Sequence, residues 1–237
     1  MTKSYLLEFM KINFATRKDH QSAIPFFNEI GYTIIKYFDI DGAQGYLAKK
    51  DNKLVLSFRG TQRSEQSDVA ADFDVIKVKE GNGNVHRGFQ QELNKLWESI
   101  TKELANHLKD NILYITGHSL GAAMATIAAY RLQDKVDTLI TFGSPRAGDI
   151  HFVNQLNVKH YRVQNTNDCV CWLPPWWIGF IHHGENIYID YYGNLGKIGF
   201  FKKIKDMTLA FQRSLQKKEY FSFWYDHRPS SYIKKLT

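Results

Sequence analysis

A glycine-flanked turn between an apolar run and an alanine-rich run constrains the fold of this chain more than any other feature. The apolar run covers residues 112–116, the turn is 117–121 (GHSLG), and the alanine-rich stretch is 122–132. The apolar run predicts a buried strand, and alanine has the highest helix propensity. A strand that turns this sharply into a helix puts Ser119 in strained backbone, and the flanking glycines leave room that larger side chains would fill. We therefore expect the Ser119 hydroxyl to project above a sheet edge at the start of a helix; the ordinary alternative is a turn capped by a serine.

The rest of the chain alternates predicted helices with predicted strands. Helical apolar spacing covers roughly 4–31, in two pieces separated around Arg17, and again 87–109. Predicted strands are 45–50 and 53–60, joined as a hairpin, and shorter ones at 139–142, 160–164 and 186–190. This alternation indicates an α/β fold with a mainly parallel central sheet and helices on both faces. No internal repeat or low-complexity linker divides the chain, so we expect a single domain over residues 1–237.

The sequence contains no segment typical of export or of membrane insertion. No apolar run approaches the roughly 18 residues that a membrane-spanning helix needs. Glu8 and Lys11 interrupt the N-terminal apolar stretch, unlike the core of a signal peptide. The cytoplasm is the default expectation, and export without a signal peptide stays open.

The two cysteines, Cys169 and Cys171, are separated by one residue. Alternate residues of an extended segment point to opposite sides, so we expect free thiols rather than a disulfide. A single pair of cysteines also lacks the second pair of ligands that a structural zinc site would need. We expect no metal ion and no organic cofactor.

The formal net charge of +7 indicates attraction to an anionic partner. No nucleic-acid recognition motif accompanies this charge, so we do not expect a nucleic-acid ligand. Residues 197–218 carry seven basic residues against Asp206, and on a helical projection one face is apolar: Phe200, Ile204, Met207, Phe211 and Leu215. A basic amphipathic helix is typical of a segment that lies on an anionic membrane surface or binds a partner; the alternative is a helix packed on the core with a solvated outer face. The sequence assigns no oligomeric state.

A serine hydroxyl is a weak nucleophile until an imidazole accepts its proton, and a carboxylate orients that imidazole. When the serine lies on a turn of this kind, the acid and then the histidine follow it in the chain. Two aspartates follow predicted strands, Asp149 and Asp168, of which Asp149 is typical of a loop or capping residue. Three histidines compete for the role of base: His182, His183 and His227.

Short segments of the chain match, in order, those of one known family. They are 57–61 (SFRGT), 85–89 (VHRGF), 117–121 (GHSLG), 141–148 (TFGSPRAG), 165–168 (NTND) followed by 173–175 (LPP), and 179–185 (GFIHHGE). Through these segments the chain resembles the fungal-type, or class 3, lipases over about residues 53–234. The resemblance implies the α/β-hydrolase fold and a catalytic triad of serine, aspartate and histidine.

The resemblance also implies roles for individual residues. Ser119 is the expected nucleophile, Asp168 the acid, and His227, in the late Asp-His segment, the base. Thr61 matches the serine or threonine that contributes to the oxyanion hole of the family. The amide of Leu120, which follows the nucleophile, is expected to donate to the same oxyanion.

Other histidines receive supporting roles or none. His182 matches a supporting position in the family, and His183 is expected to be exposed. His118, inside the turn, is expected to pack beside the site without a catalytic role.

Two regions bear on the substrate. The family usually has an amphipathic lid helix after the oxyanion residue, but 62–72 is polar here apart from 69–71, which does not favour interfacial activation. Cys171 stands where the family commonly has proline. Three tryptophans near the acid either line an acyl site or fill the core: Trp172, Trp176 and Trp177.

The sequence therefore predicts a serine carboxylic-ester hydrolase, with an ester or lipid substrate and most specifically a lipase that acts on acylglycerols through an acyl-enzyme. Phospholipase A1 and small-ester carboxylesterase stay open, because acyl-chain preference depends on the shape of the pocket. From a different class, a non-catalytic membrane-binding module on a hydrolase scaffold also stays open, although every member of the triad is present.

Overall fold

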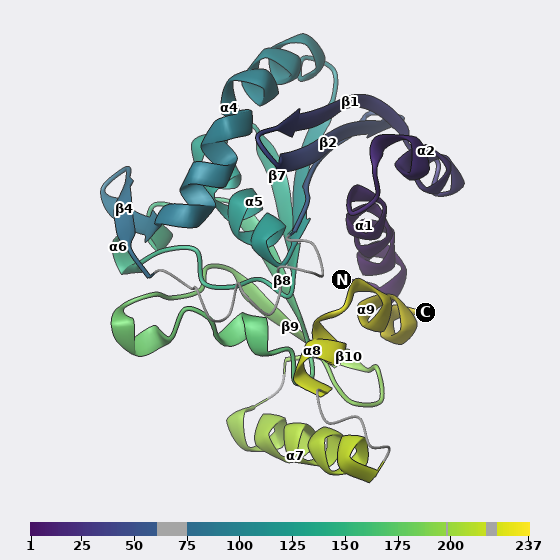
Figure 1. Cartoon of the computed structure of the whole chain (residues 1–237), viewed down its shortest axis with the longest axis vertical. Helices are drawn as coiled ribbons and strands as arrows, with labels where there is room; N and C mark the ends of the chain where they lie inside the picture. Colours follow the sequence, from purple (N-terminus) through teal and green to yellow (C-terminus); the bar gives the residue numbers. More distant parts are fainter. Residues whose placement is uncertain (61–74, 198, 217–221) are drawn as a thin grey trace.

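One large sheet organises the protein. This computed structural model describes residues 1–60, 75–197, 199–216 and 222–237, and in these ranges the sheet has eight strands in the order β1-β2-β3-β6-β7-β8-β9-β10 (Figure 1). The strands are β1 (Thr33–Ile40), β2 (Ala43–Lys50), β3 (Lys53–Phe58), β6 (Ile112–His118), β7 (Val136–Phe142), β8 (Lys159–Asn165), β9 (Glu185–Ile189) and β10 (Leu195–Gly196). Neighbours from β3 to β9 are parallel, whereas the pairs at the two ends of the sheet are antiparallel. The prediction of a mainly parallel sheet is confirmed.

Helices cover both faces of this sheet (Figure 1). On one face lie α4 (Arg87–His107) and α5 (Leu120–Arg131), and on the other α1 (Lys3–Thr16), α2 (His20–Glu29) and α9 (Pro229–Leu236). The apolar residues of α4 recur every three or four positions and are buried against the sheet, as the sequence predicts. Each face therefore has its own hydrophobic core, which holds the sheet between two helical layers.

Local signals explain where the first helices begin. Side-chain oxygens of Thr2 and Asp19 accept hydrogen bonds from the backbone N–H groups of Tyr5 and Ser22, and so cap α1 and α2. The two helical pieces predicted over 4–31 are confirmed. Strand β1 was not predicted, because most of its residues are partly or fully exposed and give no strong alternation of apolar and polar side chains.

The remaining described elements lie outside the eight-stranded sheet. They are the hairpin of β4 (Lys77–Glu80) and β5 (Gly83–His86), α6 (Ile150–Val153), the 3₁₀ turns η1 (Cys169–Trp172) and η2 (Trp176–Ile178), α7 (Phe200–Gln216) and α8 (Ser222–His227). Helix α7 lies at one end of the molecule, beyond α8 (Figure 1). Among the helices described, none combines the length and the hydropathy that a membrane crossing requires.

Candidate active site

Ser119 stands at the sharp turn between β6 and α5, with φ 61° and ψ −130°. Residues other than glycine rarely adopt this conformation, so the surrounding structure must hold it. A Cβ on Gly117 would lie 2.1 Å from the Gly121 carbonyl oxygen, and a Cβ on Gly121 would lie 2.3 Å from the Phe58 carbonyl oxygen. Any larger residue at either position would force the turn open. The prediction of a strained strand-to-helix turn at Ser119 is confirmed.

The ring of His227 connects Ser119 to Asp168. Its Nε2 lies 2.8 Å from Ser119 Oγ, and its Nδ1 lies 2.9 Å from both carboxylate oxygens of Asp168. Because a carboxylate only accepts hydrogen bonds, Nδ1 carries the ring proton and Nε2 is left to accept from the Ser119 hydroxyl. All three residues are buried: Ser119 is 8% exposed, His227 2% and Asp168 0%. Shielding from bulk water strengthens both hydrogen bonds.

The two aspartates that sequence analysis compared occupy different places. Asp168 follows β8 and caps η1, with its Oδ1 accepting from Val170 N at 3.0 Å. Asp149 caps the short helix α6 instead, with its Oδ1 accepting from Phe152 N at 3.0 Å. The interpretation of Asp149 as a capping residue is confirmed, and Asp168 is the aspartate that lies beside His227.

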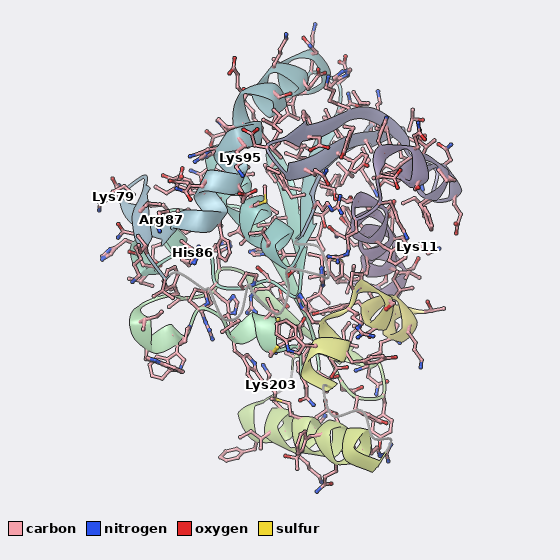
Figure 2. All side chains as sticks on the ribbon, in the orientation of Figure 1. Lys11, Lys79, His86, Arg87, Lys95 and Lys203 are labelled. Carbon is pink, nitrogen blue, oxygen red and sulfur yellow. The ribbon has the colours of Figure 1, made fainter. Side chains whose placement is uncertain are left out.

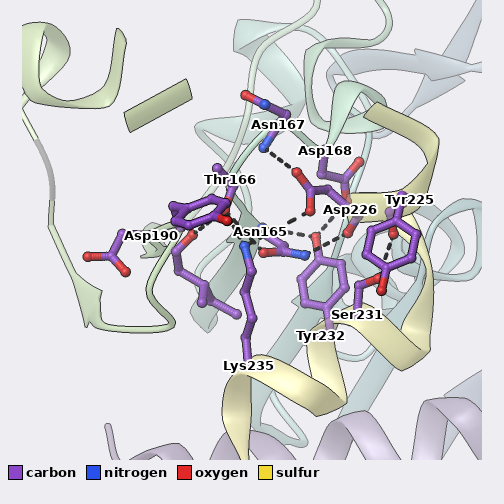
Figure 3. Close-up of polar contacts among 12 residues, drawn as sticks. Asn165, Thr166, Asn167, Asp168, Asp190, Tyr225, Asp226, Ser231, Tyr232 and Lys235 are labelled. Carbon is purple, nitrogen blue, oxygen red and sulfur yellow. Dashed lines mark hydrogen bonds and ion pairs between the residues drawn. The ribbon is translucent and has the colours of Figure 1, made fainter. Parts of the chain in front are cut away.

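Tyr232 holds the side of Asp168 that faces the C-terminal helix (Figure 3). Its hydroxyl donates to Asp168 Oδ2 at 2.5 Å and accepts from Asn165 N at 3.1 Å. Burial, and then the charge of Asp168, raise the pKa of Tyr232 well above its ordinary value, so the hydroxyl keeps its proton. This donor stabilises the ionised carboxylate. Tyr232 was not predicted from the sequence, because no motif connects a residue of the last helix to Asp168.

A second set of contacts fastens the segment that ends in His227 to the loop of the acid (Figure 3). Asn165 Nδ2 donates to the Asp226 carbonyl oxygen at 2.8 Å, and Asn167 N donates to the Asp226 carboxylate at 3.2 Å. Burial raises the pKa of Asp226 to about 6. Asp226 therefore connects the two chain segments that supply the acid and the histidine.

His118 packs beside the site, as predicted. Its ring centroid lies 4.5 Å from that of His227, and its Nε2 lies 2.7 Å from the His227 carbonyl oxygen, to which it donates. Burial lowers the pKa of His118 well below its ordinary value, so it is neutral. His118 thus supports the backbone of His227.

Neither of the other two candidate histidines contacts Ser119. His182 Nε2 donates to the Cys171 carbonyl oxygen at 2.8 Å, and burial lowers its pKa well below the ordinary value. His183 is half-buried, with its Nδ1 3.1 Å from His160 Nδ1, so the expectation that it is exposed was wrong. The cause is the packing of this loop on β8, which the sequence of the loop does not reveal.

Of the two oxyanion candidates, one is described. Leu120 is the first residue of α5, where a backbone N–H has no acceptor within the helix. Thr61 and the whole polar segment 62–72 lie outside the described residues. Gly60, the residue before Thr61, lies against the turn, since a Cβ there would come within 2.6 Å of the His118 carbonyl oxygen.

Both cysteines are free thiols, as predicted. The tryptophans after the acid are exposed by 38%, 66% and 70% at Trp172, Trp176 and Trp177, so the alternative that they fill the core is wrong. Within the described ranges, no three His, Cys, Asp or Glu side chains are arranged to hold a metal ion.

The fold and the site together define a class of protein. A mainly parallel sheet, with a serine on the strained turn from a central strand into a helix and with a histidine and an aspartate from later segments beside it, is the arrangement of an α/β-hydrolase. The sequence model of the class 3 lipase family matches residues 55–177 of the chain. The chain belongs to the class 3 lipase family.

Individual relatives agree with this assignment. The chain is 30% identical over 168 residues to a lipase of Rhizopus niveus. The match covers 63% of this chain and 42% of that protein. It is 32% identical over 153 residues to a lipase of Rhizomucor miehei, and this match covers 59% of this chain and 42% of that protein. The chain therefore spans less than half of the length of these curated relatives.

Solved structures of lipases share the fold. One is a triacylglycerol lipase whose catalytic centre is described as a serine protease triad, with a TM-score of 0.71, 22% identity and coverage of 81% of this chain and 82% of that chain. Another is lipase II from Rhizopus niveus, with a TM-score of 0.63, 24% identity and coverage of 80% and 82%. The fold that the chain shares with these lipases therefore covers most of its length.

Proposed function

We propose that the protein is a serine carboxylic-ester hydrolase, and specifically a lipase that cleaves acylglycerols. The observation that carries this proposal is the continuous contact from Ser119 Oγ through the His227 ring to the Asp168 carboxylate. The relatives of Rhizopus and Rhizomucor that are named lipases, and the structural likeness to a triacylglycerol lipase, support the choice of acylglycerols as substrate.

In this proposal His227 Nε2 takes the hydroxyl proton as Ser119 Oγ attacks the ester carbonyl. The charge that develops on the imidazolium is stabilised by Asp168. The tetrahedral intermediate collapses, the proton passes from His227 to the departing alcohol, and an acyl-Ser119 ester remains. Water then attacks this ester with His227 again as base, which releases the carboxylic acid and restores Ser119.

Two donors are proposed for the oxyanion. Leu120 N–H lies at the start of α5, where the partial positive charge of the helix dipole favours a developing negative charge. The proposed second donor is Thr61, supported by the position of Gly60 against the turn. The loss of one such donor typically lowers kcat by about 100- to 1000-fold.

The substrate class can be tested with a panel of esters. We expect wild-type protein to hydrolyse p-nitrophenyl esters of long acyl chains and a long-chain triacylglycerol emulsion, whereas Ser119→Ala protein serves as the blank. Release of the sn-1 acyl chain from a phospholipid at a higher rate would instead support phospholipase A1, and activity confined to short chains a carboxylesterase. Protein that is inert on every ester but sediments with vesicles would contradict the enzyme and support a non-catalytic membrane-binding module.

We also propose that residues 197–218 contact an anionic membrane surface. Helix α7 meets the body of the protein through polar groups, since its Asp206 carboxylate accepts from Tyr188 Oη at 2.9 Å. On its predicted apolar face Ile204 and Phe211 are 46% and 39% exposed, and the neighbouring Phe201 is 85% exposed, which supports a face open to solvent. Exposed lysines accompany these apolar side chains, which suits a surface that is both hydrophobic and negatively charged.

Vesicle binding tests this surface separately from catalysis. In the Ser119→Ala background, the double substitution Lys202→Glu and Lys205→Glu is expected to weaken binding to vesicles that contain phosphatidylglycerol. Each lysine near an anionic surface contributes about 1 kcal/mol, so reversal of two charges should weaken binding by about 30-fold or more. The matched control is Lys102→Glu with Lys109→Glu, which changes the charge equally at exposed positions near the C-terminal end of α4. An equal loss in both double variants would contradict a specific role for α7.

A further inference from the structure

The buried side chain of Arg162 has an N–H group without a partner. Arg162 is in the middle of β8, and its side chain is 8% exposed. Its Nε is enclosed and has no hydrogen-bond partner among the described residues. A buried charge that lacks a partner strongly destabilises a fold. The environment of Arg162 therefore requires an explanation.

Two more cations lie near Arg162. Lys203, on the side of α7 next to the body of the protein, donates to Gln164 Oε1 at 2.8 Å (Figure 2). Burial, and then the charges of Arg162 and Arg146, lower the pKa of Lys203. Arg146 donates to the carbonyl oxygens of Trp172 and, at 2.8 Å, of Pro174, which are neutral acceptors. Three positive charges thus come from β8, α7 and the segment after β7.

Gln164 supplies a second donor without an acceptor. Residues 162 and 164 are two positions apart on β8, so their side chains point to the same face of the sheet. Gln164 is 2% exposed, and while its Oε1 accepts from Lys203, its Nε2 is enclosed and has no partner. Buried N–H groups are rarely left without an acceptor. Arg162 and Gln164 therefore each have an enclosed N–H group without an acceptor, and the Lys203 ammonium lies beside Gln164.

No neighbouring group balances this charge. In the described ranges, Arg146, Arg162 and Lys203 take part in no ion pair. The Cys171 thiol supplies no counter-charge, because burial raises its pKa well above its ordinary value and keeps it neutral. The Asp206 carboxylate, one turn from Lys203, accepts from Tyr188 and the backbone instead.

Neutral groups cannot replace the missing counter-charge. Asn186 lies opposite Arg162 on β9, and its Oδ1 is also without a partner. A partly open pocket of about 10 Å³ adjoins Arg162 and is also lined by Ser144, His160 and His182, which leaves room for about one water molecule. The amide or the water can accept from Arg162 Nε, but both leave three positive charges together.

We propose that Arg162, Gln164 and Lys203, with the charge of Arg146, bind a phosphate-type oxyanion between β8 and α7. The planar guanidinium fork of Arg162 suits two oxygens of one tetrahedral anion, and the Gln164 amide and the Lys203 ammonium reach further oxygens. The anion supplies the negative charge that the chain lacks here, and its source is either free phosphate or the phosphate of a lipid. Because Arg146 holds the carbonyl oxygens of Trp172 and Pro174, the anion also braces the loop that begins at Asp168.

Thermal unfolding of the full chain in the Ser119→Ala background tests this site without reference to catalysis. Inorganic phosphate is titrated at constant ionic strength against sodium chloride. At about 100 times its Kd, phosphate is expected to raise Tm by roughly 5–10 °C. Arg162→Met and Lys203→Met are expected to abolish this rise, and Arg162→Met is expected to unfold no earlier than its parent without phosphate, because it removes an unpaired buried charge. Lys159→Met, an exposed lysine on the same strand, is the matched control and should keep the rise.

Different results of this titration overturn the proposal or identify the source of the anion. A rise that chloride produces equally, or that survives in both Arg162→Met and Lys203→Met, overturns the proposal. If Arg162→Met does not fold, a full phosphate response in Lys203→Met overturns it as well. A short-chain phosphatidic acid that raises Tm of the parent at lower concentration than inorganic phosphate identifies a lipid source, and the reverse order identifies free phosphate. Failure of the site would leave the proposed hydrolase untouched, since none of these measurements depends on turnover.

Discussion

Replacement of Ser119 by alanine is expected to lower kcat/KM for ester hydrolysis by about 10⁴-fold or more. The substitution removes the oxygen that lies 2.8 Å from His227 Nε2 and that forms the acyl-enzyme in the proposed mechanism. Loss of the nucleophile of a triad has effects of this size in other serine hydrolases, with a residual rate that comes from the oxyanion hole and from binding. The measurement is the initial rate on a p-nitrophenyl ester of the chain length that wild type prefers.

The same variant should remain folded, because alanine is smaller than serine and Ser119 makes no capping hydrogen bond to α5. An unchanged circular dichroism spectrum and Tm would therefore accompany the loss of activity. Ser119→Ala protein that is folded and retains a tenth or more of the wild-type rate would contradict the assignment of the nucleophile.

His227→Ala is expected to reduce the rate by about the same factor as Ser119→Ala, because residues of a triad act as a unit. Without the imidazole, no group among the described residues accepts the Ser119 proton, since His227 is the histidine that its hydroxyl contacts. The double variant with Ser119→Ala should be no worse than either single variant. Rates on the same p-nitrophenyl ester check this.

His182→Ala is the matched control for His227→Ala. Both histidines make a hydrogen bond that alanine removes, but the bond of His182 goes to the Cys171 carbonyl oxygen and not to Ser119. His182→Ala is expected to lose about 1 kcal/mol of stability and to keep most of its turnover. An inactive His182→Ala protein beside an active His227→Ala protein would show that the base was assigned to the wrong histidine.

The sequence predicted those parts of the fold that depend on short-range patterns. The turn at Ser119 requires glycines because backbone atoms come too close for any side chain, and that requirement is visible within five residues. The apolar period of α4 likewise reflects burial of one face. Strand β1 was not predicted, because its pairing with β2 depends on backbone hydrogen bonds, and these leave no pattern in exposed side chains.

The candidate site was predictable only in part. Asp168 and His227 are separated by 59 residues, and Ser119 and His227 by 108, so their contact depends on the whole sheet and on the path of the C-terminal helices. The family resemblance singled them out, and the structure brings them together. Tyr232 and the unpartnered Arg162 carried no sequence signal, because their significance lies in what surrounds them.

Covalent labelling is the most direct test of whether Ser119 is a nucleophile activated by His227. Wild-type protein is treated with a fluorophosphonate, which phosphonylates activated serines, and the product is examined by intact mass spectrometry and peptide mapping. We expect one adduct per chain, on the peptide that contains Ser119. The adduct should be absent from Ser119→Ala and form much more slowly in His227→Ala. An adduct on another residue, or labelling of His227→Ala at the wild-type rate, would contradict this assignment.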